Sequence, residues 1–189
     1  MKIRESGMPE EAYWESFFDV QNIFKNLQLD NKINDIVEFG SGYGTFTTPA
    51  AKIIRGEIHA FDIDEMMINR LKQRILEEKL SNVKIYQTDF VKGGTKLTDK
   101  SVDYAMLFNI LHAEKPQDIL NETFRILRNG GKTGIIHWRY DPSTPRGPSM
   151  EIRPKPEDLK NMLVNSGFNI LRFNINLPQY HYGILAQKI

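Results

Sequence analysis

The sequence predicts an α/β domain in which a mostly parallel sheet carries helices on both faces and ends in an antiparallel hairpin. Two observations support this fold class. From residue 35 to residue 138, short apolar runs alternate with segments of helical periodicity, a pattern typical of parallel strands joined by helices. Near the end of the chain, two apolar runs follow each other around Pro178 without a helix between them, which favours an antiparallel hairpin.

The elements are expected in the following order. The residues at 13–29 have the spacing of one amphipathic helix. Strands are expected at 36–39, 58–61, 83–86, 102–110 and 134–138, with helices at about 45–55, at about 65–79 and after Pro116. Asp64 suits the N-cap of the second of these helices, and Asn129-Gly130-Gly131 suits the end of the third. A last helix from Pro156 to Gly167 precedes strands at 168–175 and 181–186.

Length and composition limit the classes of protein to consider. The 189 residues suffice for a single domain, and a formal charge of +1 gives no global field for holding nucleic acid. The absence of cysteine excludes disulfides and thiolate catalysis and is compatible with a reducing compartment. The first residues, MKIRESGMPEEA, lack the apolar stretch of a secretory signal, and no apolar run approaches the roughly 20 residues of a membrane span. We therefore expect a cytoplasmic protein with no integral membrane association and no nucleic-acid partner.

A glycine-rich turn is the most informative motif. Val37-Glu38-Phe39-Gly40-Ser41-Gly42-Tyr43-Gly44 lies where the first strand turns into the next helix. Glycines there let the backbone approach a ligand and present its N–H groups at the edge where open sheets bind ligands. The dinucleotide-binding pattern G-x-G-x-x-G requires a glycine at position 45, where this chain has Thr45. The spacing therefore disfavours a nicotinamide-dependent reductase.

Two carboxylates follow at the ends of the next two strands. Asp62, in Phe61-Asp62-Ile63-Asp64, can accept hydrogen bonds from both hydroxyls of a ribose, whereas Asp64 fits a helix cap better. Asp89, in Thr88-Asp89-Phe90, can accept a hydrogen bond from the amino group of an adenine. Alternatively, Asp89 is a loop residue whose side chain caps the next turn. The sequence thus predicts a nucleotide-like ligand along this edge.

Taken in order, VEFGSGYG, FDID, QTDF and LFNILH resemble the motifs of the class I S-adenosylmethionine-dependent methyltransferases, over about residues 35 to 138. The finer likeness is to small quinone-biosynthesis-type methyltransferases. The resemblance implies a Rossmann-like, seven-stranded, mostly parallel sheet and S-adenosyl-L-methionine as cofactor. It divides the single domain at 1–189 into an N-terminal lid helix region at 1–30, a cofactor-binding core at 33–138, a substrate-side loop at 139–156, and a helix with the terminal hairpin at 157–189.

The resemblance also implies roles for single residues. Glu38 orients the methionine end of the cofactor through the glycine loop, and Asn109 lies near the methionine ammonium. The other residues implied in cofactor binding are Gly40, Ser41, Gly42, Gly44, Asp62, Ile63, Asp89 and Phe90. Tyr13 and Trp14 belong to a segment that resembles the lid helix of the family, although an ordinary amphipathic helix on the sheet explains the same apolar stripe.

The acceptor side is less defined. Arg139, Tyr140 and Arg146 can clamp a small planar or carboxylate-bearing acceptor, or belong to a loop whose arginines are solvated or paired locally. His112 and His137 fall on the same edge, each as a general base or as a merely hydrogen-bonded histidine. No residue spacing indicates a metal site. We expect in-line methyl transfer to a small anionic or aromatic molecule, or alternatively a catalytically silent sensor or scaffold that binds the cofactor.

Overall fold

The computed structural model of the chain describes residues 8–189. The first seven residues of the predicted N-terminal region lie outside this range. The helices are α1 Glu11–Glu15, α2 Val20–Asn26, α3 Thr47–Ala51, α4 Glu65–Glu77, α5 Phe90–Gly93, α6 Pro116–Ile126 and α7 Pro156–Asn165. The strands are β1 Ile36–Phe39, β2 Ile58–Asp62, β3 Val83–Gln87, β4 Val102–Phe108, β5 Leu127–Trp138, β6 Phe168–Leu177 and β7 His181–Lys188.

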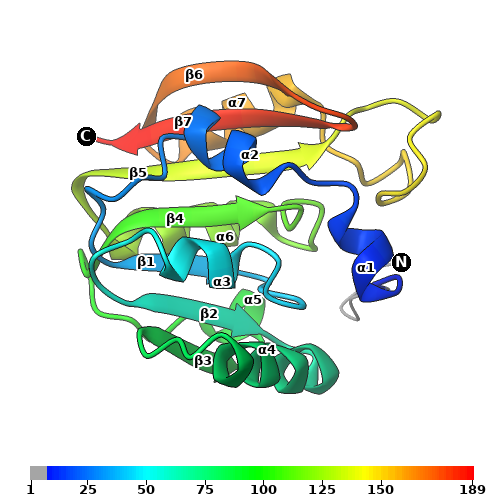
Figure 1. The fold of residues 1–189 in the computed structure, drawn as a ribbon. Coiled ribbons are helices and arrows are strands. Elements are labelled where there is room, and N and C mark those ends of the chain that lie inside the picture. Colours follow the sequence, from blue (N-terminus) through cyan, green and yellow to red (C-terminus); the bar gives the residue numbers. More distant parts are fainter. Residues whose placement is uncertain (1–7) are drawn as a thin grey trace.

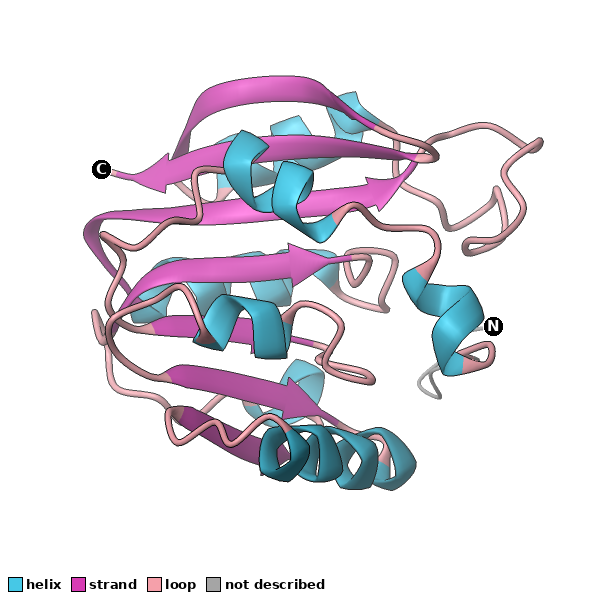
Figure 2. Ribbon diagram, in the orientation of Figure 1, coloured by secondary structure: helices cyan, strands magenta, loops and turns pink. Residues whose placement is uncertain are grey.

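The strands form one seven-stranded sheet in the order β3-β2-β1-β4-β5-β7-β6. Strands β1 to β5 are parallel, and β7 runs antiparallel between β5 and β6. Helices lie on both faces of the sheet (Figure 2). The predicted fold class, including the antiparallel C-terminal hairpin, is therefore confirmed.

The direction of β7 matters for the site. Parallel strands all end at one edge of the sheet, so the loops after β1, β2, β4 and β5 gather there. Because β7 runs the opposite way, its first residue, His181, lies at that same edge, paired with Trp138 at the end of β5. Figure 1 shows α1 and the loop between β5 and α7 beyond this edge.

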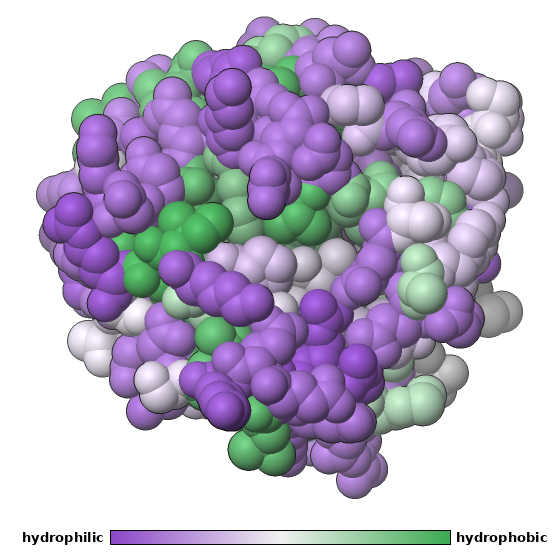
Figure 3. All heavy atoms as spheres, viewed as in Figure 1, coloured by the Kyte–Doolittle hydropathy of each residue, from purple (hydrophilic) through white to green (hydrophobic). Residues whose placement is uncertain are grey.

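The sheet is covered on both faces by separate apolar cores. One packs α6 and α7 against the sheet, with Leu120 and Leu159 fully buried. The other packs α2 and α3, with Ile23 and Ala50 buried. All four residues of β1 are buried, as expected for a central strand covered on both sides. On the face that carries α2 and α3, hydrophilic side chains cover most of the surface, with hydrophobic ones gathered in small patches (Figure 3).

The prediction of one helix at 13–29 is wrong, because two helices occupy this segment. Helix α1 ends at Glu15, and α2 begins after Asp19, whose side chain accepts a hydrogen bond from the backbone N–H of Asn22 at 3.0 Å. Helix α2 buries Ile23 and Phe24, whereas α1 buries no residue. The two interpretations of the stripe therefore apply to different helices: α2 covers the sheet, and α1 lies beside the edge where the strands end (Figure 1).

Two further boundaries differ from the prediction. Helix α6 ends at Ile126, and β5 begins at the next residue, so Asn129-Gly130-Gly131 lies inside the strand rather than at a helix end. Gly130 has φ +80°, which marks a local irregularity in β5. Helix α5 was not predicted. The expected cap at Asp64 is confirmed, since its side chain accepts from Met66 N at 2.9 Å.

Candidate functional site

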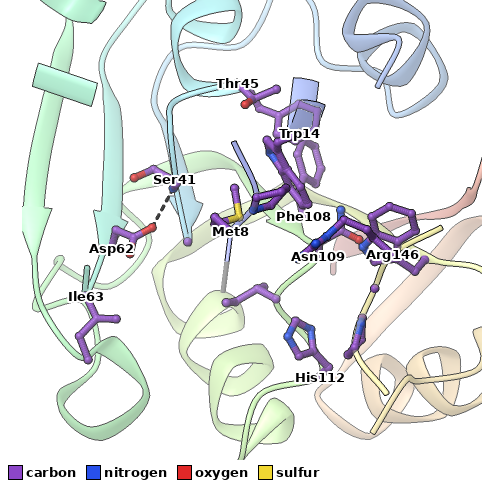
Figure 4. Close-up of a pocket in the computed structure, with 18 of the residues that line it drawn as sticks. Met8, Trp14, Ser41, Thr45, Asp62, Ile63, Phe108, Asn109, His112 and Arg146 are labelled. Atoms are coloured by element: carbon purple, nitrogen blue, oxygen red, sulfur yellow. Dashed lines mark hydrogen bonds between the residues drawn. The ribbon is translucent and has the colours of Figure 1, made fainter. Parts of the chain in front are cut away.

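A cavity of about 260 Å³ lies at the edge of the sheet where the parallel strands end. The residues that line it come from the α1 region, the loop after β1, the ends of β2, β4 and β5 with the segments that follow them, and the start of α5. They are Met8, Pro9, Trp14, Gly40, Ser41, Gly42, Thr45, Phe46, Asp62, Ile63, Phe90, Phe108, Asn109, Ile110, His112, Trp138, Arg146, Gly147 and Pro148. Figure 4 shows the labelled side chains arranged around this space. The cavity therefore lies at the edge that the sequence predicts for ligand binding.

The glycine loop forms the floor of the cavity. The N–H groups of Gly40 and Ser41 both donate to the Phe61 carbonyl, at 2.8 and 2.9 Å, which joins the loop to β2. Gly44 does not line the cavity. It has φ +85°, and a Cβ there would lie 2.5 Å from Leu71 Cδ1 of α4, so only glycine fits this close packing. The third glycine therefore sets the packing of the loop against α4.

Asp62 joins the end of β2 to the same loop. Its carboxylate accepts from Gly42 N at 2.7 Å and from Asp64 N at 3.0 Å, and the first of these bonds is dashed in Figure 4. The side chain is 7% exposed, and burial raises its pKa while these backbone bonds oppose the rise. A carboxylate can accept about four hydrogen bonds, so Asp62 retains capacity for ligand hydroxyls. Ile63 lies beside it at the cavity rim and is 40% exposed.

Glu38 lies beneath the loop and does not line the cavity. It is 1% exposed and accepts a hydrogen bond of 2.5 Å from Thr47 Oγ1 of α3. Burial raises its pKa to about 8; the Thr47 bond opposes this rise and the nearby Asp62 charge adds to it. Glu38 thus supports the loop from below as a largely protonated group at neutral pH.

Asp89 and Phe90 take different positions. Phe90 lines the cavity, with its ring 5.2 Å from that of Phe39 in an edge arrangement. Asp89 is not among the lining residues. Its carboxylate accepts from Lys92 N at 3.2 Å and lies 3.7 Å from Lys92 Nζ, so it caps α5. The capping alternative is thus the arrangement found, and Asp89 is not brought to the cavity.

Four buried polar atoms of cavity-lining residues have no hydrogen-bond partner within residues 8–189: Ser41 Oγ, Thr45 Oγ1, Asn109 Oδ1 and His112 Nδ1. Asn109 has the left-handed backbone φ of +54° and follows directly after β4. An unpaired buried polar atom costs about 1–3 kcal/mol. Four of them around one cavity indicate a site built for a polar ligand. Thr45 was not assigned to the site from the sequence, where it only helped to exclude a dinucleotide.

The two candidate histidines lie together, but only one lines the cavity. The rings of His112 and His137 are 5.5 Å apart, and His137 is completely buried behind His112. Burial, with a smaller effect of the Arg153 charge, lowers the pKa of His112 to about 4, and burial lowers that of His137 as well. Both imidazoles are therefore neutral at physiological pH, and His112 is the one that a ligand can reach.

Helix α1 brings one of its two candidate residues to the cavity. Trp14 lines it, with its ring 6.4 Å from that of Trp138. Tyr13 does not; it is 47% exposed and packs its ring 4.8 Å from that of Phe17. Trp138 also lines the cavity. In the sequence it stands beside Arg139, at the start of the stretch expected to clamp the acceptor, although it was not among the assigned site residues.

Ion pairs hold α1 to α4. Glu11 lies 2.6 Å from Arg70 Nε and 3.3 Å from Arg74 Nη1, and Arg74 also pairs with Glu15. The hydroxyl of Tyr43 donates to the Pro9 carbonyl at 2.8 Å, which joins the start of α1 to the glycine loop. These contacts place α1 over the cavity edge.

The loop after β5 contributes Arg146 to the cavity, but neither Arg139 nor Tyr140. Arg139 donates to the Asn176 side chain and, at 3.4 Å, to the carbonyl of His181. Tyr140 is 44% exposed, with Lys155 Nζ 4.7 Å above its ring. Of the two alternatives that the sequence offered, these two residues follow the second: they make contacts within the loop and with the terminal hairpin and do not reach the cavity.

Arg153 organises this loop and was missed from the sequence. It is 8% exposed, and within residues 8–189 it donates hydrogen bonds only to oxygens of the loop. Its acceptors are the carbonyls of Arg139, Asp141, Arg146 and Pro148 and the hydroxyl of Thr144. A single buried guanidinium thus folds the loop against the cavity wall. A charged residue among prolines was the only sequence signal.

No group of three or more His, Asp or Glu side chains within residues 8–189 is placed to hold a metal ion. Within the same residues, no helix is long and apolar enough to cross a membrane.

Comparisons with known proteins place this geometry in a family. A family model described as "Methyltransferase domain" matches residues 36–131, just over half of the chain. A protein of Methanosphaera stadtmanae named "Probable ribosomal RNA small subunit methyltransferase A" is 35% identical over 121 residues, which cover 61% of this chain and 41% of that protein. The chain thus spans less than half the length of this relative.

Solved structures share the fold. A SAM-dependent methyltransferase from Aquifex aeolicus superposes with a TM-score of 0.84 at 21% identity, covering 95% of each chain. A geranyl diphosphate methyltransferase solved in complex with SAM superposes with a TM-score of 0.74 at 11% identity, covering 97% of this chain and 93% of that one. At such identities the likeness concerns the fold. Together with the family match, it shows that the chain belongs to the methyltransferase-domain family, which confirms the resemblance to class I S-adenosylmethionine-dependent methyltransferases.

Proposed function

We propose that this methyltransferase transfers the methyl group of S-adenosylmethionine to a small anionic or aromatic acceptor. The observation that carries the proposal is the division of one cavity into two halves. The loop after β1 and the end of β2 form the half that suits the cofactor. Aromatic side chains and the loop after β5 form the other half.

The residues of the first half fit the cofactor. Asp62 has capacity for the ribose hydroxyls, and Phe90 and Ile63 lie on the side where the base would pack. The unpaired Ser41 Oγ and Asn109 Oδ1 would meet the polar methionine end. When bound, S-adenosylmethionine supplies a methyl group on a sulfonium, which is an excellent leaving group. The protein then contributes mainly by orienting the acceptor, and proximity can supply roughly 7–11 kcal/mol.

The second half suits a small acceptor with a planar or anionic group. Trp14 and Trp138 provide aromatic surface that excludes water. Arg146 and the neutral His112 are the charged and titratable residues of this half, while Asp62 is the one carboxylate in the described lining and belongs to the other half. An anionic acceptor therefore meets no like charge. His112 is the candidate general base by position, but burial lowers its pKa to about 4, so it is a weak proton acceptor and the proposal favours an acceptor that arrives deprotonated.

Calorimetry with S-adenosylhomocysteine tests the cofactor half. Asp62→Asn is expected to weaken binding about tenfold or more, because charge-assisted hydrogen bonds to the ribose are lost. Asp64→Asn is the matched control, since asparagine also caps helices and Asp64 does not line the cavity. Absence of binding by the unaltered protein would overturn the cofactor assignment.

Ribosomal RNA is the second candidate acceptor, favoured by the similarity to the Methanosphaera protein. The formal charge of +1 favours the small molecule, because RNA binding depends on many phosphate contacts. A labelled-methyl assay that compares small ribosomal subunits with a panel of aromatic and aliphatic acids separates the two. Label in RNA would contradict the small-acceptor proposal. Cofactor binding without S-adenosylhomocysteine formation from any acceptor would favour the silent sensor or scaffold.

A further inference from the structure

His181 is a buried residue beside the cavity for which the proposed reaction gives no role. It begins β7, is fully buried and does not line the cavity. Its ring packs 4.3 Å from that of Trp138 and 4.8 Å from that of Phe18. An apolar side chain would fit such aromatic surroundings at least as well. The presence of an imidazole therefore calls for a polar function.

The polar contact of His181 is with Asn109. The Asn109 Nδ2 atom lies 3.4 Å from His181 Nε2, while Asn109 Oδ1 has no partner within residues 8–189. The backbone of Asn109 is fixed independently, because its N–H donates to the Ile136 carbonyl at 2.9 Å. The remaining freedom of this residue is the rotation of its amide, and His181 contacts one end of that amide.

The place of Asn109 along the sheet edge matches the methionine end of the cofactor. Asp62, Gly40 and Asn109 end or follow the adjacent strands β2, β1 and β4. Two strand spacings separate the outer two strands by about 10 Å. A Cβ at Gly40 would lie 3.1 Å from Ile110 Cδ1, so the loop packs directly on the end of β4. A ligand with its ribose at Asp62 therefore extends its other end along the loop toward Asn109.

We propose that His181 is a positioning residue: its Nε2 accepts a hydrogen bond from the Asn109 amide nitrogen and thereby turns Asn109 Oδ1 toward the methionine ammonium of the cofactor. The inference rests on the proposed function, because it assumes that S-adenosylmethionine binds in this cavity. It adds a residue from the terminal hairpin to the cofactor half of the site.

The environment of His181 supports the acceptor role that this arrangement requires. Burial, with a smaller effect of the Arg139 charge, lowers the pKa of His181 to about 3. The imidazole is therefore neutral, and one of its two nitrogens can accept. Nδ1 has no hydrogen-bond partner within residues 8–189, so the contact with Asn109 is what decides the tautomer: with the proton on Nδ1, Nε2 is free to accept from the Asn109 amide. In the other tautomer Nε2–H would attract Oδ1 and turn it away from the ammonium.

Two ligands that differ only at the methionine end separate positioning from folding. S-adenosylhomocysteine carries the ammonium, whereas 5′-methylthioadenosine has the same nucleoside and thioether without the amino-acid end. His181→Met removes the acceptor at similar volume. We expect it to weaken S-adenosylhomocysteine binding about tenfold and to leave 5′-methylthioadenosine binding unchanged. Asn109→Ala is expected to show the same selectivity, and the double variant should lose no more than Asn109→Ala alone.

Two controls keep the test decisive. His181→Gln retains an oxygen acceptor and is expected to recover part of the lost affinity. Long-range proton–nitrogen NMR of the unaltered protein should find the proton of His181 on Nδ1, a measurement that applies even where a variant does not fold. Equal weakening of both ligands, or a proton on Nε2, would overturn the role of His181. If the unaltered protein bound neither ligand, the cofactor assignment itself would be contradicted.

Discussion

Glu38→Gln tests whether the buried carboxyl beneath the glycine loop carries a proton in the folded protein. Burial raises the pKa of Glu38 from 4.5 to about 8. Between these pH values the folded protein keeps a proton that the unfolded chain has released, so stability falls as pH rises. The decline is roughly 1.4 kcal/mol per pH unit and reaches on the order of 5 kcal/mol before it levels off above about pH 8.

Glutamine has nearly the shape of a protonated glutamate and no proton to lose. The variant is therefore expected to lack this decline and to become progressively more stable than the unaltered protein toward pH 8. Urea denaturation of both cofactor-free proteins between about pH 5 and pH 8 measures the difference. Glu77→Gln, at an exposed position on α4, is the control variant, because it removes one carboxyl group without changing a buried site. A stability difference that stays constant across this range would refute the reasoning.

Two further predictions concern the elements around the cavity. Arg74→Met removes the contacts of α4 with Glu11 and Glu15. Because such partly exposed pairs contribute up to about 1 kcal/mol, the variant should release S-adenosylhomocysteine about two- to fivefold faster in stopped-flow experiments at low salt, with the difference shrinking at high salt. Arg153→Lys leaves several loop carbonyls without a donor, so it should lower the free energy of unfolding by about 2–4 kcal/mol and expose residues 139–148 to limited proteolysis.

Specific results would contradict each of these two predictions. A release rate that is independent of salt in both proteins would mean that the ion pairs of α1 do not control the exit of the ligand. A lysine variant that resists proteolysis as well as the unaltered protein would mean that the loop keeps its shape without the guanidinium. In that case Arg153 would not be the residue that organises the loop.

The sequence predicted the features that depend on local pattern. Alternating apolar runs were enough for the parallel sheet and its terminal hairpin, and the glycine spacing distinguished the loop after β1 from a dinucleotide turn. Asp62 could be placed because it ends a strand next to that loop, and the structure joins the two through Gly42 N. Such residues are fixed by their position on one strand and its neighbour.

The features that depend on contacts across the chain were not predictable. The break between α1 and α2 follows from Asp19 capping the second helix, whereas periodicity alone continues the stripe through it. Arg153 belongs to no sequence motif. Its guanidinium donates hydrogen bonds to carbonyl oxygens of the loop, and only the folded chain brings these oxygens together. His181 meets Asn109 across a separation of 72 residues, and only the reversed direction of β7 brings it to this edge.

Because β7 runs in the reversed direction, the turn between β6 and β7 lies near the acceptor half of the cavity, where its sequence can vary independently of the cofactor half. The turn between β6 and β7 projects at the edge where the parallel strands end, and Tyr180 in this turn stacks its ring 6.3 Å from that of Trp138. A hairpin turn can change in length or sequence without altering the pairing of the strands below it. Variation at residues 178–180 would therefore reshape the wall behind Trp138 while the glycine loop and Asp62 stay unchanged. Libraries directed at this turn are a direct route to new acceptor specificity with the cofactor site intact.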